Sequence, residues 1–203
     1  MCVAPVVFLL SPANCAGTRA RMLLKSQTSP LTARLANGGA PLGEVFTFMS
    51  SLYFRGKLAY ATTFGTPPDG WSAALVIAPG RGLMAAEHSI RVADLEGMAE
   101  VPVDEDEPRY REPLLRDANA LATALGGAGR AVLLGSVASE KYVTPLLEVF
   151  GERLYFPATF VGRGDMSRGG LMLRCARAGT PLECVPVRGA TRHGVRPPKL
   201  GRP

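Results

Sequence analysis

Short apolar runs of strand length alternate with helical segments along this chain, and that alternation restricts the fold more than any other feature. The runs Val6–Leu10, Ala73–Ala78 and Ala131–Leu134 are continuous, and each ends at Ser, Pro or Gly. Continuous runs of this length are typical of parallel strands that are buried on both faces. The same pattern predicts a fourth strand over Arg153–Phe156 and a last edge strand over residues 182–187.

Helical periodicity occupies the intervals between these strands. The predicted helices cover residues 18–24, 30–36, 41–64, 92–98, 113–125, 139–150 and 167–178. Ser29-Pro30 is a favourable start for the second of them, and Gly56 marks a point where the longest one divides in two. The alternation predicts an α/β fold, a three-layer αβα sandwich around a mainly parallel sheet of four or five strands.

The length and charge distribution indicate one domain with a basic tail. A chain of 203 residues with 47% apolar residues forms one full core, so we expect a single α/β domain over residues 1–187. Of the 23 basic residues, five lie in residues 188–203 beside no acid, which leaves 18 against 17 acidic residues elsewhere. The Pro/Arg-rich tail is predicted to be flexible and solvated, and contact with nucleic acid is the alternative interpretation.

Composition also bounds the compartment and the chemistry. No apolar run approaches the ~20 residues that span a bilayer, so no membrane partner is expected. The four cysteines form no C-x-x-C pair and match no common zinc spacing, which indicates a cytoplasmic protein with free thiols, no metal and no cofactor. Cys15 is interpreted as a small buried apolar residue rather than a nucleophile.

Right-handed crossovers place the loops that follow parallel strands at one edge of the sheet, where ligands bind in such folds. Four loops should meet there: residues 11–17, 79–82, 135–142 and 160–170. The predicted ligand-binding residues are Ser11, Asn14, Arg81, Gly82, Gly135, Ser136, Lys141, Gly162, Arg163, Gly164, Asp165, Ser167 and Arg168. Their glycines allow a ligand to approach the backbone, and their polar side chains orient it.

The glycine-rich loop at 160–170 joins a strand to a helix, so it offers backbone N–H groups to an anion. Arg163 and Arg168 are suited to clamp a phosphate or carboxylate. The alternative is a surface pair bridged to Asp165 or Glu44. Asp165 is interpreted as a helix N-cap, with a general base or ribose acceptor as the alternative.

The chain lacks several familiar catalytic signatures. Neither G-x-G-x-x-G after the first strand nor G-x-x-x-x-G-K-[ST] is present, which disfavours the usual NAD and P-loop modes. The two histidines, His88 and His193, are not placed near a serine, so a Ser-His-Asp triad is not expected. The catalytic candidates that remain are Asp165, Asn14 and Lys141, and the residues do not decide whether the protein is an enzyme.

Four blocks of the chain resemble a known group of domains. They are Leu10–Cys15, Leu52–Tyr60, Leu75–Met84 and the final loop with its helix. In this order they are similar to uncharacterised bacterial domains of the uracil-DNA-glycosylase-like superfamily and to the domain attached to archaeal tRNA-guanine transglycosylases, over about residues 3–175. The resemblance implies an αβα sandwich and a link to nucleobase or nucleic-acid chemistry.

The same resemblance does not extend to base excision. Active glycosylases of the superfamily carry a polar or acidic residue after the first strand and a histidine in the last loop. Here the first loop offers Asn14 and no acid, and residues 162–170 contain no histidine.

Three functions are therefore compared. The first is an anion site for phosphate or a nucleotide at the sheet edge, in a protein that binds or acts on a nucleobase, nucleotide or nucleic acid. The second is an enzyme with a small anionic substrate, and the third is a non-catalytic protein-interaction module. A basic surface around the four loops would favour the first, a deep closed pocket the second and a shallow apolar patch the third.

Overall fold

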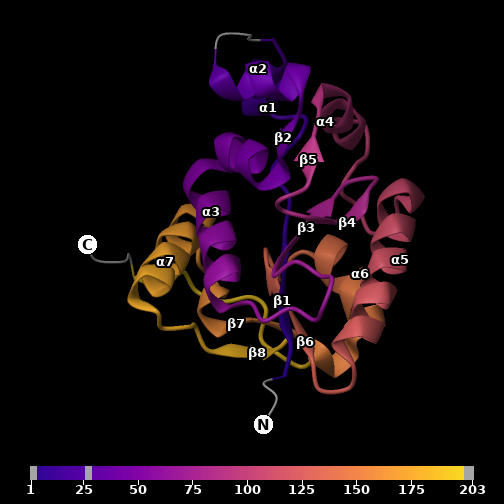
Figure 1. The fold of residues 1–203 in the computed structure, drawn as a ribbon. Helices are drawn as coiled ribbons and strands as arrows, with labels where there is room; N and C mark the ends of the chain where they lie inside the picture. Colours follow the sequence, from indigo (N-terminus) through magenta and orange to yellow (C-terminus); the bar gives the residue numbers. More distant parts are fainter. Residues whose placement is uncertain (1–3, 26–28, 199–203) are drawn as a thin grey trace.

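The computed structural model describes residues 4–25 and 29–198 and confirms the α/β fold (Figure 1). Its main sheet has the order β4-β3-β1-β6-β7-β8. The strands are β1 (Val6–Leu10), β3 (Ala74–Ala78), β4 (Gly82–Ala85), β6 (Arg130–Leu134), β7 (Leu154–Pro157) and β8 (Cys184–Pro186). The four inner strands are parallel, and β4 and β8 close the two edges as antiparallel strands.

The side chains of β1 show why the sheet is covered on both faces. Val7 and Leu9 belong to one hydrophobic cluster, and Phe8 and Leu10 belong to the other. All four are buried, as alternation along a central strand requires. The chain therefore forms a sheet between two helical layers, which is the predicted three-layer sandwich.

One helical layer contains α5 (Pro108–Leu125) and α6 (Glu140–Phe150), whose apolar faces join the Val7 cluster. The other contains α1 (Thr18–Lys25), α2 (Pro30–Asn37), α3 (Leu42–Phe64), α4 (Val92–Ala99) and α7 (Asp165–Ala178). A short antiparallel pair, β2 (Ala40–Pro41) and β5 (Ser89–Ile90), lies beside this layer, and 3-10 turns at Gly151–Arg153 and Ala158–Phe160 flank β7.

The longest helix differs from its prediction. The break in α3 lies at Ser51, with φ 49° and ψ −124°, and not at Gly56. Gly56 instead allows α3 and α7 to touch: a Cβ there would lie 2.5 Å from the carbonyl oxygen of Gly169. A Cβ at Gly169 would in turn lie 2.6 Å from the carbonyl oxygen of Leu52. Glycine at both positions sets the close crossing of the two helices.

The first part of the basic tail lies against the molecule. Arg192 pairs with Glu140 at 2.8 Å, and the carbonyl of Val195 faces Gly162, where a Cβ would meet it at 2.3 Å. Val195 is nevertheless 93% exposed, and tail residues 199–203 lie outside the described residues. Flexibility of the tail stays a prediction. Within residues 4–25 and 29–198, no helix is both long enough and apolar enough to cross a membrane.

Candidate functional site

Polar side chains gather around a cleft at the carboxyl ends of β1 and β6. The cleft has a volume of about 410 Å³ and is lined from four segments: the loop after β1, the kink of α3, the loop after β6 with the start of α6, and the start of α7. Its lining residues are Ser11, Pro12, Ala13, Asn14, Ser50, Tyr53, Ser136, Ser139, Lys141, Tyr142 and Asp165. We call it the edge cleft.

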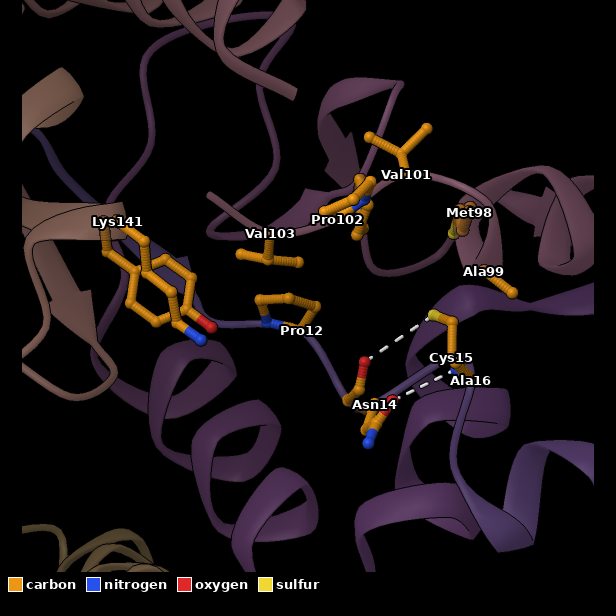
Figure 2. Close-up of a pocket in the computed structure, with 13 residues that line it drawn as sticks. Pro12, Asn14, Cys15, Ala16, Met98, Ala99, Val101, Pro102, Val103 and Lys141 are labelled. Atoms are coloured by element: carbon orange, nitrogen blue, oxygen red, sulfur yellow. Dashed lines mark hydrogen bonds between the residues drawn. The ribbon is translucent and has the colours of Figure 1, made fainter. Parts of the chain in front are cut away.

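A second hollow of about 370 Å³ adjoins the edge cleft and shares Pro12, Asn14 and Lys141 with it (Figure 2). Its other wall is the segment from Met98 to Val103, so this side is more apolar. Asn14 Oδ1 accepts a hydrogen bond from the backbone N–H of Ala16 at 3.1 Å, which fixes the amide at the junction of the two spaces.

The start of α6 supplies the cleft with positive potential. Ser139 is the N-cap, but its side chain makes no capping hydrogen bond, so no side chain there competes for the first N–H groups of the helix. Lys141 lies in the first turn and lines the cleft. The Tyr110 hydroxyl donates to the Lys141 carbonyl at 2.9 Å and holds this turn on α5. An anion is stabilised at such a place.

Asp165 brings a carboxylate to the opposite wall. It is the first residue of α7, and Gly164, not Asp165, is the N-cap, so the predicted N-cap role is wrong. The Asp165 side chain is 66% exposed and lies 3.5 Å from the Arg168 guanidinium. A carboxylate in the first turn is favoured by the helix dipole, and this one faces the cleft as an acceptor.

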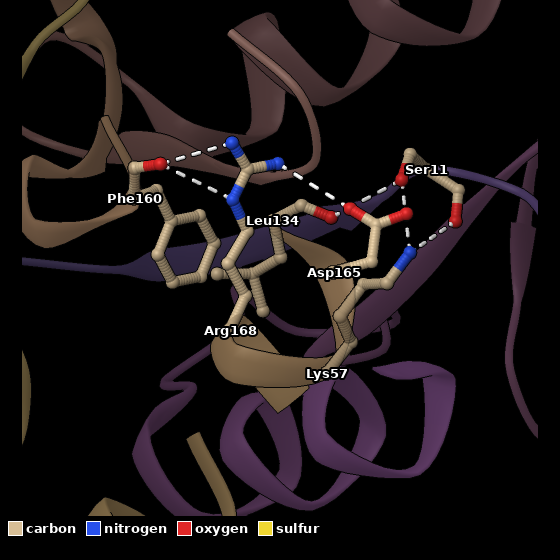
Figure 3. A network of polar contacts seen from close by, with 6 residues as sticks. All are labelled: Ser11, Lys57, Leu134, Phe160, Asp165 and Arg168. Atoms are coloured by element: carbon tan, nitrogen blue, oxygen red, sulfur yellow. Dashed lines mark hydrogen bonds and ion pairs between the residues drawn. The ribbon is translucent and has the colours of Figure 1, made fainter. Parts of the chain in front are cut away.

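Beneath the cleft lies a buried lysine (Figure 3). Lys57 of α3 is 1% exposed, and its Nζ lies 2.7 Å from the Ser11 carbonyl oxygen and 2.8 Å from Ser11 Oγ. The ring of Tyr53 lies 4.0 Å from the same Nζ. Burial lowers the pKa of Lys57 to about 7, and Arg168 acts in the same direction, while Asp165 opposes both.

Tyr53 presents a buried hydroxyl to the same space. The residue is 6% exposed and lines the edge cleft, and its hydroxyl makes no hydrogen bond of normal geometry within the described residues. Burial raises the pKa of Tyr53 to about 12, with Arg168 and Ser11 near enough to lower it in part. A buried polar group without a partner is costly, and such groups mark sites that a ligand completes.

The structure brings five of the predicted residues together in the edge cleft: Ser11, Asn14, Ser136, Lys141 and Asp165. Gly135 stands directly behind Ser11, because a Cβ on Gly135 would lie 3.2 Å from Ser11 Oγ. These positions lie at one edge of the sheet, as right-handed crossovers between parallel strands predict.

The two arginines of the glycine-rich loop do not line the edge cleft, because they form hydrogen bonds within their own segment. Arg168 is buried, and its Nε and Nη2 donate to the Phe160 carbonyl at 3.2 and 2.9 Å, so it closes the loop on itself. Arg163 donates to the Thr159 carbonyl and to Ser167 Oγ. Glu44, which the sequence suggested as a partner of Arg163 and Arg168, pairs with Arg34 instead.

A different hollow receives part of that loop. Arg163, Gly164 and Ser167 line a space of about 340 Å³ between α3, α7 and the tail, apart from the edge cleft. The prediction that these three residues line one pocket with Asn14 and Lys141 is therefore wrong. Gly162 approaches the tail at Val195 rather than a ligand.

Arg81 and Gly82 also lie elsewhere, because the loop after β3 is a tight turn into β4. Arg81 pairs with Asp94 of α4 at 2.9 Å. Gly82 lies against α5, where a Cβ would meet Asp117 Oδ2 at 2.1 Å, and this carboxylate accepts from the N–H of Leu83. Neither Arg81 nor Gly82 lines the edge cleft or the hollow that adjoins it.

Three site residues escaped the sequence argument: Ser50, Tyr53 and Lys57, all on α3. Helical periodicity assigns α3 to the core and gives no reason to place its residues at a strand edge. Ser51, between the first two, has a positive φ that costs a non-glycine residue about 1–3 kcal/mol. Strain of this kind clusters at functional sites, but only the structure reveals it.

Cys15 fits its interpretation as a buried apolar residue. It is 6% exposed, its thiol donates to the Ala13 carbonyl at 3.6 Å, and burial raises its pKa to about 12. A thiol in that state is a poor nucleophile. Comparison of the chain with family models, with curated proteins and with solved structures found no match.

Proposed function

We propose that the protein binds a small molecule with an anionic group, of the nucleotide class, in the edge cleft. The observation that carries this proposal is the convergence of Lys141 and the start of α6 on one wall with Asp165 on the other. Lys141 and the N–H groups of α6 favour a phosphate or carboxylate.

The opposite wall suits the remainder of a nucleotide. The Asp165 carboxylate accepts hydrogen bonds from hydroxyl or amino groups, as a ribose or a base offers. Asn14 Oδ1 accepts from the N–H of Ala16, and Asn14 lines the cleft, so its side-chain amide adds N–H donors at this wall. The Tyr53 hydroxyl, which makes no hydrogen bond of normal geometry within the described residues, adds a buried group that a ligand can satisfy.

The charge distribution supports a small ligand over a polymer as the main partner. Within the cleft, Lys141 is opposed by Asp165, and outside the tail the chain carries 18 basic against 17 acidic residues. Non-specific affinity for nucleic acid depends on many phosphate contacts. A nucleic-acid partner would use the basic tail, and the link to nucleobase chemistry rests on the resemblance of the sequence. A cytoplasmic location is part of the same proposal.

The test is calorimetric titration of the full chain with nucleoside monophosphates, with a free nucleobase and with inorganic phosphate. Lys141→Ala should weaken nucleotide binding at least about 10-fold, since a charge-assisted hydrogen bond contributes roughly 1.5–3 kcal/mol. Arg163→Ala removes the same charge from the other hollow and should leave the affinity unchanged. Loss of binding in Arg163→Ala but not in Lys141→Ala would move the site to that hollow, and no binding of any probe would refute the proposal.

A further inference from the structure

Ser11 and Lys57 form a pair that the ligand-binding proposal does not use. Ser11 Oγ lies 2.8 Å from Lys57 Nζ, and Ser11 lines the edge cleft, whereas Lys57 lies behind it and is 1% exposed. A nucleophile within hydrogen-bond reach of a base, with the base held by a third group, is the recurring arrangement of covalent catalysis. We propose that Ser11, with Lys57 as its base, is a nucleophile for acyl transfer from a small polar carboxylic ester.

The hydrogen bonds at Nζ are compatible with a neutral amine. A neutral amine has two N–H donors and one lone pair. In the structure Nζ donates to the Ser11 carbonyl at 2.7 Å and to Ser11 Oγ at 2.8 Å, while Ser11 Oγ donates to the Leu134 carbonyl at 3.5 Å. Rotation of the hydroxyl from Leu134 toward Nζ presents its proton to the lone pair of the neutral amine. The Ser11 carbonyl thus aims the base at the hydroxyl of the same residue (Figure 3).

The surroundings of Nζ set its protonation. Burial, with Arg168 in addition, disfavours the ammonium, and the pKa of Lys57 falls to about 7. Asp165 and the rings of Tyr53 and Phe54, at 4.0 and 5.2 Å, favour the ammonium. The balance leaves a substantial neutral fraction near pH 7, as a general base requires.

Space for a substrate exists beside the hydroxyl. Gly135 follows β6, and a Cβ at this position would lie 3.0 Å from Ser11 Cβ and 3.2 Å from Ser11 Oγ. A side chain at Gly135 would therefore crowd the hydroxyl, which faces the cleft that Ser11 lines. The uncapped start of α6 lies in the same cleft and offers N–H groups for the oxyanion of a tetrahedral intermediate. The serines, the amide and the two charges of the lining favour a polar acyl group over an aliphatic one.

The step is balanced with water as the only co-reactant. Ser11 Oγ bonds to the ester carbonyl carbon while its proton passes to Lys57 Nζ. The ester C–O bond then breaks, and the ammonium returns the proton to the leaving alkoxide. Water next attacks the acyl group with Lys57 as base, which releases the acid and restores Ser11.

The test is labelling of the full chain with a fluorophosphonate, a probe that needs no nucleotide and is therefore independent of the proposed ligand. Ser11 Oγ bonds to phosphorus, fluoride leaves, and the proton passes through Lys57 to solvent. Peptide mapping should find the adduct at Ser11, with a rate that rises with pH and has a midpoint near 7. Ser11→Ala should abolish it, and Lys57→Met should slow it at least about 100-fold.

Ser72→Ala is the matched control, because Ser72 Oγ also lies beside a potential base, 2.9 Å from Glu87 Oε2, yet lines no part of the cleft. Its labelling should equal that of the wild type. No adduct at Ser11, or an equal rate in a folded Lys57→Met, would overturn the proposal. If Lys57→Met does not fold, a wild-type rate at Ser11 without a midpoint between pH 6 and 8.5 overturns it instead.

Discussion

The edge cleft and the glycine-rich loop both carry polar and charged side chains, but the side chains of the cleft face open space and those of the loop bind its own backbone. In the cleft, the buried Tyr53 hydroxyl makes no hydrogen bond of normal geometry within residues 4–25 and 29–198, and Lys141 lines open space. In the loop, Arg168 spends two donors on the carbonyl of Phe160. Charged side chains among glycines therefore indicate a ligand site only where the backbone has not already bound them.

The helix contact beneath the loop gives the largest expected effect. Gly169→Ala would place a Cβ 2.6 Å from the Leu52 carbonyl and 2.7 Å from Tyr53 Cα, so α3 and α7 must separate. We expect a loss of about 3 kcal/mol or more in the free energy of unfolding, measured with urea. Gly164→Ala, with nothing within 4 Å of its Cβ, should cost about 1 kcal/mol or less. Equal losses would contradict a structural role for the loop.

Arg168 and Arg163 allow the comparison to be tested within the loop itself. Arg168→Ala removes two charge-assisted donors from the Phe160 carbonyl, which keeps the backbone N–H of Arg163 at 3.1 Å, and should cost about 2–3 kcal/mol. Arg163→Ala removes a half-buried side chain that bonds Thr159 and Ser167, and should cost about 1 kcal/mol. The measurement is the free energy of unfolding of both variants in urea, and the loss should be larger for Arg168→Ala. A stable Arg168→Ala that binds nucleotides less tightly would restore Arg168 to a ligand site.

Much of the fold follows from the sequence, because buried parallel strands and amphipathic helices leave period-specific patterns. The right-handed crossover rule then correctly predicted that Ser11 and Lys141, which are far apart in the chain, lie at the same edge of the sheet. It failed at Arg81, since β3 is followed by a hairpin and not by a helix. The Pro79-Gly80 turn was visible, but β4 after it begins with glycine and holds no β-branched residue, so it leaves no strand pattern.

Lys57 could not be found from the sequence. A lysine in a helix is expected on the solvated face. It is buried here because Gly56 and Gly169 let α7 approach α3, and that depends on which glycines meet across 113 positions of sequence. The burial of Lys57 depends on how the two helices pack, which the secondary structure of either helix does not reveal.

The buried lysine predicts a pH dependence that belongs to the cleft and not to the loop. The pKa of Lys57 is about 7 when folded and 10.5 as an ordinary lysine, so between these values the unfolded chain holds a proton that the folded chain has released. The free energy of unfolding should therefore rise with pH, by up to about 1.4 kcal/mol per unit. Lys57→Met should lack this rise.

The measurement is urea unfolding of both proteins between pH 7 and 8.5. Above this range, burial of Cys15 and Tyr53 acts in the reverse direction, because their raised pKa values make the unfolded chain lose protons first. A difference between wild type and Lys57→Met that is constant across the window would show that Lys57 stays charged when folded.

The smallest expected effect concerns strain, which the cleft holds at Ser51. Its φ of 49° with ψ −124° suits glycine, so Ser51→Gly should raise the free energy of unfolding by about 1 kcal/mol. Ser50 is helical and borders the same cleft, and Ser50→Gly should lower it by roughly 0.5–1 kcal/mol. Opposite signs at adjacent serines would show that the kink is imposed on the helix by its contacts and kept at a cost. Two losses of similar size would mean that the helix runs straight through Ser51, and Ser50 and Tyr53 would then no longer face the cleft as described.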